Sequence, residues 1–457
     1  MGKGGQSRPL AAELGEPEER QPVWSSGVPF FPPSDRYWRI GGEWYDFEPF
    51  LHKHPGGAQI LRLSRDRFED CTHVFESHHH NYKRARAIIQ KYKVPTEEAL
   101  RTVRPRPAKP AHVVHGANFD EATPPPQLLG DESFYSVVRK RLDDHLRSIG
   151  CREGGPTTGC CALFWVTFLA WAGSWLLTYA TGSVCAALLL GASATWLGAF
   201  GHNWVHQPRY RLWSYFSLDT IGFSSDGWYR EHVLQHHMYT NTPWDNHFLG
   251  TDPFLVTDPT VLRAWWQRAI TPYLNPLLLS FGLYANYMAH AVETLKGNEV
   301  FRPSKLLLPL QIFLMVQRWG LHGALLVYVS NAVLGVWYFS LALMNHNSEH
   351  SHDVDARNGA RDWGEAQLQV STDWGVDLPF YRAGIYLWLN FHTIHHLFPR
   401  LDFSHHPAAQ RILLETCQEH GVKYTTAHSF FKVYKEMVHS FQTPQSLYKE
   451  IMVYGKL

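Results

Sequence analysis

The sequence predicts an α-helical membrane protein with about four transmembrane helices and a His-rich helical cap, preceded by a small globular domain. The chain has no Asp, Glu, Lys or Arg between Glu153 and Arg209, nor between Arg318 and Glu349. Ordinary soluble domains rarely exclude charge for that long, so an entirely soluble protein is excluded. The 42 Lys and Arg residues balance 41 Asp and Glu residues, which gives no electrostatic reason to expect a nucleic-acid partner.

Changes in composition divide the chain into four parts. Residues 1–25 are rich in Gly, Pro and charge and predict a disordered tail. Residues 26–98 have the composition of a small folded domain. Residues 99–128 contain RPRPAKP and TPPPQ, and this Pro-rich linker cannot continue a helix or a sheet. Residues 129–457 form the predicted membrane domain, which becomes polar again from residue 350 onward, where we expect the helical cap.

Five apolar segments are the candidates for membrane helices: 160–181, 184–200, 270–292, 305–320 and 322–345. A span needs roughly 20 helical residues. We favour four spans, with 270–292 lying along the membrane interface. The alternative makes 270–292 the third span and leaves 305–320 at the interface. Both arrangements keep the same parity, which puts every histidine cluster on one side of the membrane.

The front domain carries a histidine pattern suited to haem. The HPGG motif at residues 54–57 follows a W…YD…F pattern, and T-x-x-F then precedes the run of three histidines at 78–80. Haem iron can take two axial imidazoles, and glycines let a turn lie close to the porphyrin edge. Residues 26–98 resemble cytochrome b5. The resemblance implies a small α+β domain that binds haem b through His54 and His79, with His78 as the alternate ligand.

Four further histidine clusters lie beside apolar segments of the membrane domain. They comprise His202 and His206; His232, His236 and His237; His346 and His350; and His392, His395 and His396. Residues three and four apart share one face of a helix, so each cluster can direct several imidazoles at one point. Eight to ten nitrogen ligands exceed the four positions of one zinc ion, so two metal ions fit the count. The protease motif HExxH is absent, since Asn203, Val233, Asn347 and Thr393 follow the leading histidines.

These clusters resemble those of the membrane fatty-acid desaturase family. The resemblance extends to HHMYTN with the following Asp252-Pro253, to HTIHHLFPRL and to QEHGVKY, and it covers most of residues 130–430. A cytochrome b5 domain fused in front matches desaturases that carry their own electron donor, and also the cytochrome-b5-related branch.

This resemblance implies an O2-dependent fatty-acyl desaturase with two non-haem iron ions held by the ten histidines. Electrons would come from a cytochrome b5 reductase through the chain's own haem. The substrate would be a CoA- or lipid-linked acyl chain entering from the bilayer. The family also implies a multi-pass protein of the endoplasmic reticulum membrane, with the haem domain and the histidine clusters facing the cytosol.

The sequence departs from the pattern of front-end desaturases at two positions. Front-end desaturases usually begin the cluster nearest the C-terminus with Gln, whereas His392 stands here, and they commonly place Asp after the leading histidine of the first cluster, where Asn203 stands. Their regioselectivity is therefore not carried over. A hydroxylase on the same diiron core and a non-catalytic membrane haem electron carrier are the alternative functions.

Ligating imidazoles need outer hydrogen-bond acceptors, and the carboxylates near in sequence are Glu349, Asp252, Asp219, Asp226 and Asp245. We interpret His290 and His322 as helix-packing residues.

Overall fold

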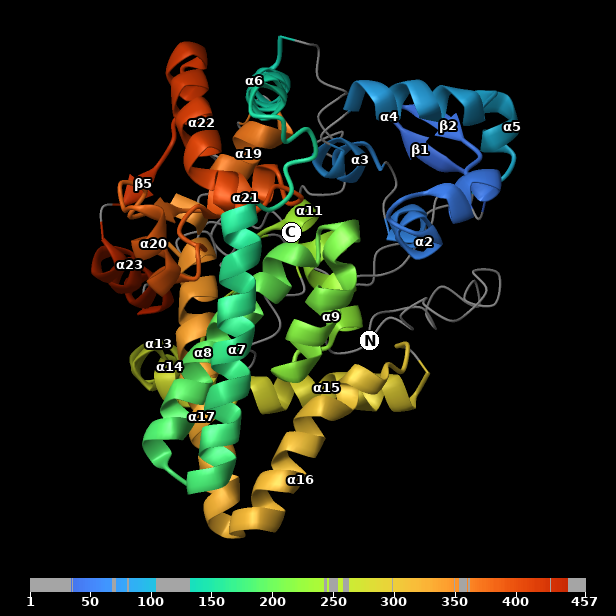
Figure 1. Ribbon diagram of the computed structural model, residues 1–457. Helices are drawn as coiled ribbons and strands as arrows, with labels where there is room; N and C mark the ends of the chain where they lie inside the picture. Colours follow the sequence, from blue (N-terminus) through green and yellow to red (C-terminus); the bar gives the residue numbers. More distant parts are fainter. Residues whose placement is uncertain are drawn as a thin grey trace.

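The computed structural model describes residues 34, 36–67, 71–79, 82–103, 132–241, 245, 254–257, 263–297, 299–348, 350–352, 360, 362–427 and 429–442. The predicted tail and most of the predicted linker lie outside these residues. A small unit with a β-sheet packs beside a larger helical part, whose long helices run side by side below a cap of shorter ones (Figure 1).

The small unit contains a three-stranded antiparallel sheet in the order β1-β2-β3. Gly41 and Gly42 both have positive φ angles, 63° and 76°, as a two-residue hairpin turn between β1 and β2 requires. Trp38, Phe47 and Phe75 are among the buried aromatic residues of its core. The elements are β1 (Trp38–Ile40), β2 (Glu43–Tyr45), η2 (Glu48–Lys53), α2 (Ala58–Arg67), α3 (Thr72–His78), α4 (Tyr82–Ile89), η3 (Gln90–Tyr92), β3 (Lys93–Val94) and α5 (Thr96–Leu100).

Two helical hairpins form the centre of the larger part. The first joins α7 (Thr158–Thr181) to α8 (Val184–Trp204) through Gly182, which ends α7 in the left-handed conformation. The second joins α16 (Leu307–Trp319) to α17 (Leu321–His346) through Gly320. Within the described residues, α7, α8 and α17 are long and apolar enough to cross a membrane.

The two weaker apolar segments form shorter helices. Segment 305–320 gives the 13-residue α16, which at 1.5 Å per residue is about 20 Å long and does not span the hydrocarbon core alone. Segment 270–292 forms α14 (Thr271–Ser280) and α15 (Gly282–Leu295), divided at Phe281, and both lie across the long helices (Figure 1). The predicted fold class is confirmed. Three helices are long and apolar enough to cross a membrane, and the predicted span at 305–320 is the short helix α16.

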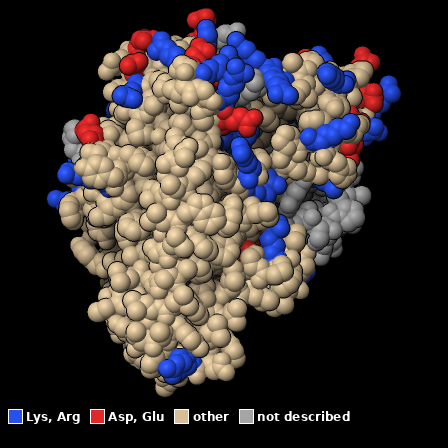
Figure 2. All heavy atoms as spheres, in the orientation of Figure 1, with Lys and Arg blue, Asp and Glu red and all other residues tan. Residues whose placement is uncertain are grey.

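Charge is distributed as a membrane protein requires. Lys, Arg, Asp and Glu gather on the small unit and the cap, whereas the visible surface of the long helices is almost free of them (Figure 2). Large apolar side chains of these apolar helices are exposed, such as Leu169 of α7 by 65%, Phe313 of α16 by 60% and Leu321 of α17 by 91%. Such a surface is stable against lipid but not against water.

Shorter elements complete the cap and connect it to the long helices. In the cap, β4 pairs with β5 in parallel. The elements are α6 (Phe134–Ser148), η4 (Pro208–Tyr210), α9 (Arg211–Thr220), α10 (Ser225–Trp228), the π-helix η5 (Tyr229–His236), α11 (His237–Tyr239), α13 (Trp265–Ala269), η6 (Pro303–Leu306), η7 (His350–His352), α19 (Trp363–Gln369), β4 (Asp373–Trp374), α20 (Phe380–Ala383), η8 (Gly384–Tyr386), α21 (His392–Leu397), η9 (Phe403–His405), α22 (His406–His420), β5 (Thr426–Ala427) and α23 (Phe430–Gln442).

Glycines allow the helices around α17 to approach closely. A Cβ atom on Gly335 of α17 would lie 2.3 Å from the carbonyl oxygen of Leu279 in α14, and one on Gly191 of α8 would lie 2.5 Å from that of Ser330. Helices in lipid associate through such small residues, because burial from water does not drive them together. Helix α17, which ends in His346, is therefore held in place by backbone contacts on two sides.

Replacing Gly335 with Ala should destabilise the protein, because its methyl group has to push α14 away. We expect a loss of about 1–3 kcal/mol, as for overpacking in a core, measured as a lower thermal unfolding midpoint in detergent. Gly173→Ala in α7 is the matched control, because nothing lies within 4 Å of a Cβ at Gly173. Equal midpoints for the two variants would contradict this interpretation of the packing.

Candidate metal centre

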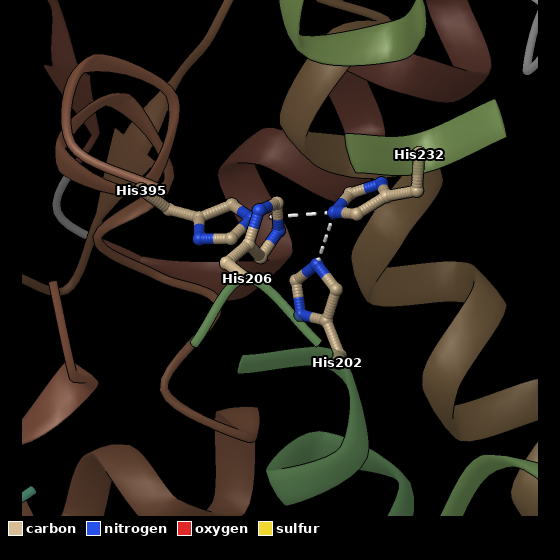
Figure 3. Close-up of side chains that lie close together, drawn as sticks. All are labelled: His202, His206, His232 and His395. Atoms are coloured by element: carbon tan, nitrogen blue, oxygen red, sulfur yellow. Dashed lines mark hydrogen bonds between the residues drawn. The ribbon is translucent and has the colours of Figure 1, made fainter. Parts of the chain in front are cut away.

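Eight of the predicted histidines form two clusters of four where the long helices meet the cap. His202, His206, His232 and His395 form the first cluster; His236, His346, His392 and His396 form the second. In each cluster one nitrogen from every ring lies within 4.8 Å of the others, and all eight residues are buried. The four rings of the first cluster point toward one another from three separate segments of the chain (Figure 3). Each cluster offers one metal ion four imidazole nitrogens.

The π-helix η5 determines how the HVLQHH segment presents its histidines. In an α-helix, residues five apart point in clearly different directions, because one turn takes 3.6 residues. A π-helix has i→i+5 hydrogen bonds and a wider turn, so both His236 and His237 can share a side with His232. The His232 ring lies 5.3 Å from that of His236 and 4.6 Å from that of His237. One helix thus serves both clusters.

In the first cluster, several imidazole nitrogens converge on one atom. The Nε2 atom of His232 lies 2.7 Å from Nε2 of His202, 3.2 Å from Nε2 of His237 and 3.4 Å from Nε2 of His395. A neutral imidazole nitrogen takes part in one such hydrogen bond, as donor or acceptor. Both ring nitrogens of His206 are buried without a hydrogen-bond partner among the described residues. These nitrogens are arranged around a common point, as metal ligands are.

The second cluster provides a stricter test, because outer acceptors fix its tautomers. Nδ1 of His236 lies 2.9 Å and 3.0 Å from the two carboxylate oxygens of Asp245, and Nδ1 of His346 lies 2.9 Å from the carbonyl oxygen of Val370. Both Nδ1 atoms must therefore carry the proton, which leaves a lone pair on each Nε2. The two Nε2 atoms face each other at 3.1 Å. Two lone pairs at this distance repel unless a cation lies between them, so this donor set fits a metal ion.

Thr240 extends the same arrangement to His396. Its hydroxyl donates to the carbonyl oxygen of His236 at 2.6 Å and can accept from Nδ1 of His396 at 3.2 Å. The Nε2 lone pair of His396 then also points into the second cluster. Hydrogen bonds from the outer nitrogen of a ligating histidine orient the ring and raise its basicity.

Burial keeps these imidazoles neutral. It lowers the pKa of His236 to about 3. The pKa values of His206, His237, His392, His395 and His396 also lie well below the usual value, first because of burial and then because of neighbouring histidines. A metal needs the neutral ring, because a protonated nitrogen has no lone pair to share.

Two buried carboxylates position the segment that carries His392, His395 and His396. Asp373 of β4 accepts from the backbone N–H of Thr393 at 2.6 Å at the start of α21. Asp402 accepts from Nε1 of Trp204 at 3.0 Å, which ties the segment after α21 to the end of α8. Burial raises the pKa of Asp373 to about 6.

The other predicted residues have different surroundings. His237 lies between the clusters, with its ring 4.6 Å from that of His395 and 4.4 Å from that of His396. His350 joins neither cluster, since its Nε2 bonds the carbonyl oxygen of Leu368 at 2.9 Å. Asp245 is the outer carboxylate of His236, whereas Asp219 and Asp226 bond Ser225 and Arg302 instead. Glu349 and Asp252 lie outside the described residues.

The sequence analysis did not identify two of the outer hydrogen-bond partners, Val370 for His346 and Thr240 for His396. The partner at Val370 is a backbone carbonyl, which no residue type indicates. Thr240 could have been considered, because its hydroxyl lies four residues after His236 in HHMYTN. His290 is buried and packs closely against Gly227 of α10, and in addition its Nδ1 bonds the buried Glu299 carboxylate at 2.7 Å, which the sequence did not predict. His322 is exposed and bonds the carbonyl oxygen of Gly182.

In the small unit, His54 and His79 face each other. Their ring centroids are 6.0 Å apart, close to the roughly 6 Å expected for two imidazoles on opposite sides of one metal with metal–nitrogen bonds near 2 Å. Nδ1 of His79 lies 2.7 Å from the carbonyl oxygen of Phe75, so its Nε2 carries a lone pair. Burial lowers the pKa of His54 to about 4 and that of His79 to about 3. These features fit a haem with two axial imidazoles.

His54 also depends on the small residue that follows its proline. A Cβ atom on Gly56 would lie 2.7 Å from Cε1 of His54. His78 points elsewhere, with its ring centroid 6.1 Å from that of His206. His80 lies outside the described residues.

Comparisons with known proteins agree with both sites. Residues 182–428, more than half of the 457, match the family model "Fatty acid desaturase", and residues 30–96 match "Cytochrome b5-like Heme/Steroid binding domain". The chain is 25% identical to a cytochrome b5-related protein of Drosophila melanogaster, over 87% of this chain and 86% of that one. It is 26% identical to an acyl-lipid (7-3)-desaturase of Chlamydomonas reinhardtii, over 83% and 75%. It is also 25% identical to an acyl-lipid (8-3)-desaturase of Mortierella alpina, over 88% and 92%.

Asp245→Asn should weaken metal binding while the fold stays intact. The amide can still accept from His236, but it carries no negative charge to strengthen that ligand. Loss of such an outer carboxylate typically costs ten- to a hundredfold in metal affinity, which equilibrium dialysis with iron or cobalt would measure. Asp377→Asn, at an exposed position, is the control. An unchanged affinity in Asp245→Asn would show that the second cluster does not bind through His236.

The two sites should also be separable by mutation. His54→Ala should abolish the haem absorption spectrum and leave the metal content of the clusters unchanged, whereas His236→Ala should reduce that metal content and leave the spectrum intact. Metal analysis and visible spectroscopy on the same samples give both numbers, with exposed His52→Ala as the control. Loss of haem in His236→Ala would rule out two independent centres.

Proposed function

Since the chain belongs to the fatty acid desaturase family, we propose that its two histidine clusters hold the diiron centre of an O2-dependent acyl desaturase supplied by its own haem. The protein is an oxidoreductase with a cytochrome b5-like haem domain and a desaturase domain. The convergence of deprotonated imidazole nitrogens in the second cluster is the observation that carries the proposal. Bound iron, with O2, supplies the strong oxidant that removal of hydrogen from an unactivated methylene requires.

The residues have distinct roles in this proposal. Nine histidines ligate the metal ions, with His237 placed between the two clusters; His350 is left out because its Nε2 bonds a backbone carbonyl. Asp245, Val370 and Thr240 hold the protons of the outer ring nitrogens, so that the inner lone pairs stay available. His54 and His79 are the axial ligands of haem b.

The half-buried Trp228 and the buried Tyr338 lie next to the first cluster and would shield it from water. Trp228 stacks on His232 with ring centroids 4.8 Å apart, and Tyr338 of α17 lies 6.3 Å from both Trp228 and His202. Exclusion of water protects a strong oxidant from side reactions.

The domain division and the location follow from the same proposal. Residues 26–98 form the haem domain together with residues 99–103, which complete α5 and pair Val103 with Ser34, so that the linker shortens from the predicted 99–128 to 104–128. Residues 129–457 form the membrane domain. The ends of α8 and α17 carry His202 and His346, so the clusters lie on one side of the membrane. We infer that this side is the cytosolic side of the endoplasmic reticulum, where a cytochrome b5 reductase would supply electrons.

Product analysis tests the activity. Iron-loaded protein, with O2, a reductase and lipid- or CoA-linked acyl chains, should give products lighter by two hydrogens, detected by mass spectrometry. A product heavier by one oxygen would identify a hydroxylase instead. His236→Ala should form neither product. Haem without metal in the clusters of the purified wild type, together with no product, would leave only the electron-carrier function.

A further inference from the structure

Two arginines of the membrane domain bond the two segments that carry the facing histidines of the haem unit. Nη2 of Arg211 in α9 donates to the carbonyl oxygen of Gly56, two residues after His54, at 2.6 Å. Nη1 of Arg400, four residues after His396, donates to the carbonyl oxygen of His78 at 2.8 Å. Each arginine therefore holds the backbone beside one axial position.

The same contact surface is apolar around these bonds. Leu234 of η5 is fully buried in the core of the haem unit, and Met238 of α11 packs against that core. Arg139 of α6 forms a further ion pair with Glu76 of α3. The η5–α11 segment, which supplies histidines to both clusters, thus touches the haem unit directly.

His78 completes a short route between the two centres. His78 directly precedes His79 in the chain. Its ring centroid lies 6.1 Å from that of His206 in the first cluster. One covalent link and one ring-to-ring contact therefore connect an axial ligand of the haem to a ligand of the metal pair.

We propose that His78 is the electron-transfer contact between the haem and the metal centre, and that Arg211 and Arg400 are positioning residues that hold it there. This inference rests on the proposed function. The step moves one electron: ferrous haem is oxidised to ferric haem, and one ferric ion held by the first cluster is reduced to ferrous. No bond is made or broken, and no proton has to move.

The two arginines also have an electrostatic effect on the haem. Their guanidinium groups are bonded to the backbone of Gly56 and His78, beside the two axial histidines. A nearby cation destabilises ferric haem, which carries one more positive charge, relative to ferrous haem. Contact with the membrane domain should therefore raise the reduction potential of the haem.

Potentiometric titration of the haem in the full chain, without iron in the clusters, tests the positioning residues. Arg211→Gln and Arg400→Gln should each shift the midpoint potential to a more negative value, and Arg400→Lys should restore part of the shift. The exposed neighbour Arg209→Gln is the matched control and should leave the potential unchanged. Unchanged potentials in both Gln variants would overturn the role assigned to the arginines.

Anaerobic single-turnover kinetics on the iron-loaded chain test His78. After rapid reduction of the haem, its absorbance reports the electron transfer. His78→Ala should slow haem oxidation at least tenfold, as misplacement of reacting groups does, with haem spectrum and iron content unchanged; His78→Gln is the second variant and exposed His52→Ala the control. A wild-type rate in both His78 variants would overturn this inference alone. A wild-type haem that never passes its electron to loaded iron would overturn the proposed function with it.

Discussion

The structure depends on one constraint: buried imidazoles from separate parts of the chain must all turn their lone pairs toward two points. No single helix can do this, so α8, η5, α17 and α21 have to end or pass at the same level. The outer acceptors are as important as the ligands, because a carboxylate on His236 and a carbonyl on His346 decide which nitrogen is free. The glycine contacts of α17 and the carboxylate cap of α21 serve the same end, since each fixes a ligand-bearing segment.

A buried ion network supports η5 from its other side. Arg230, within that helix, pairs with Glu299 at 2.9 Å, and His290 and Lys305 bond the same carboxylate. Although burial opposes ionisation, His290, Arg230 and Lys305 hold the pKa of Glu299 well below its usual range. Loss of one partner would leave an uncompensated buried charge, which typically costs several kcal/mol. This network therefore holds the π-helix in register with respect to the transverse helix α15, which carries His290.

Much of this organisation could be predicted from the sequence, because charge exclusion and histidine spacing are local signals. The apolar helices, the small haem unit and the desaturase-type clusters all follow from them. Other features depend on tertiary structure. The separation of His350 from its neighbour His346 results from a chain turn after α17, and the carbonyl of Val370 has no side chain by which to recognise it. His290 lies in an apolar stretch, and only the fold reveals that Glu299 lies beside it. The division of ten histidines into two sets also could not be read from spacing, because η5 contributes to both.

The π-helix has a consequence for how this sequence can change over evolutionary time. Its wide turn depends on the number of residues between Tyr229 and His237, not only on which residues they are. Deletion of one residue there would return the segment to ordinary α-helical winding and rotate part of the HVLQHH set away from its partners. A substitution at a position of η5 that carries no histidine keeps the number of residues, and so it keeps the π-helical turn. Insertions and deletions in this segment should therefore be selected against far more strongly than substitutions. Related sequences should keep the number of residues in the segment even where the residues other than the histidines differ.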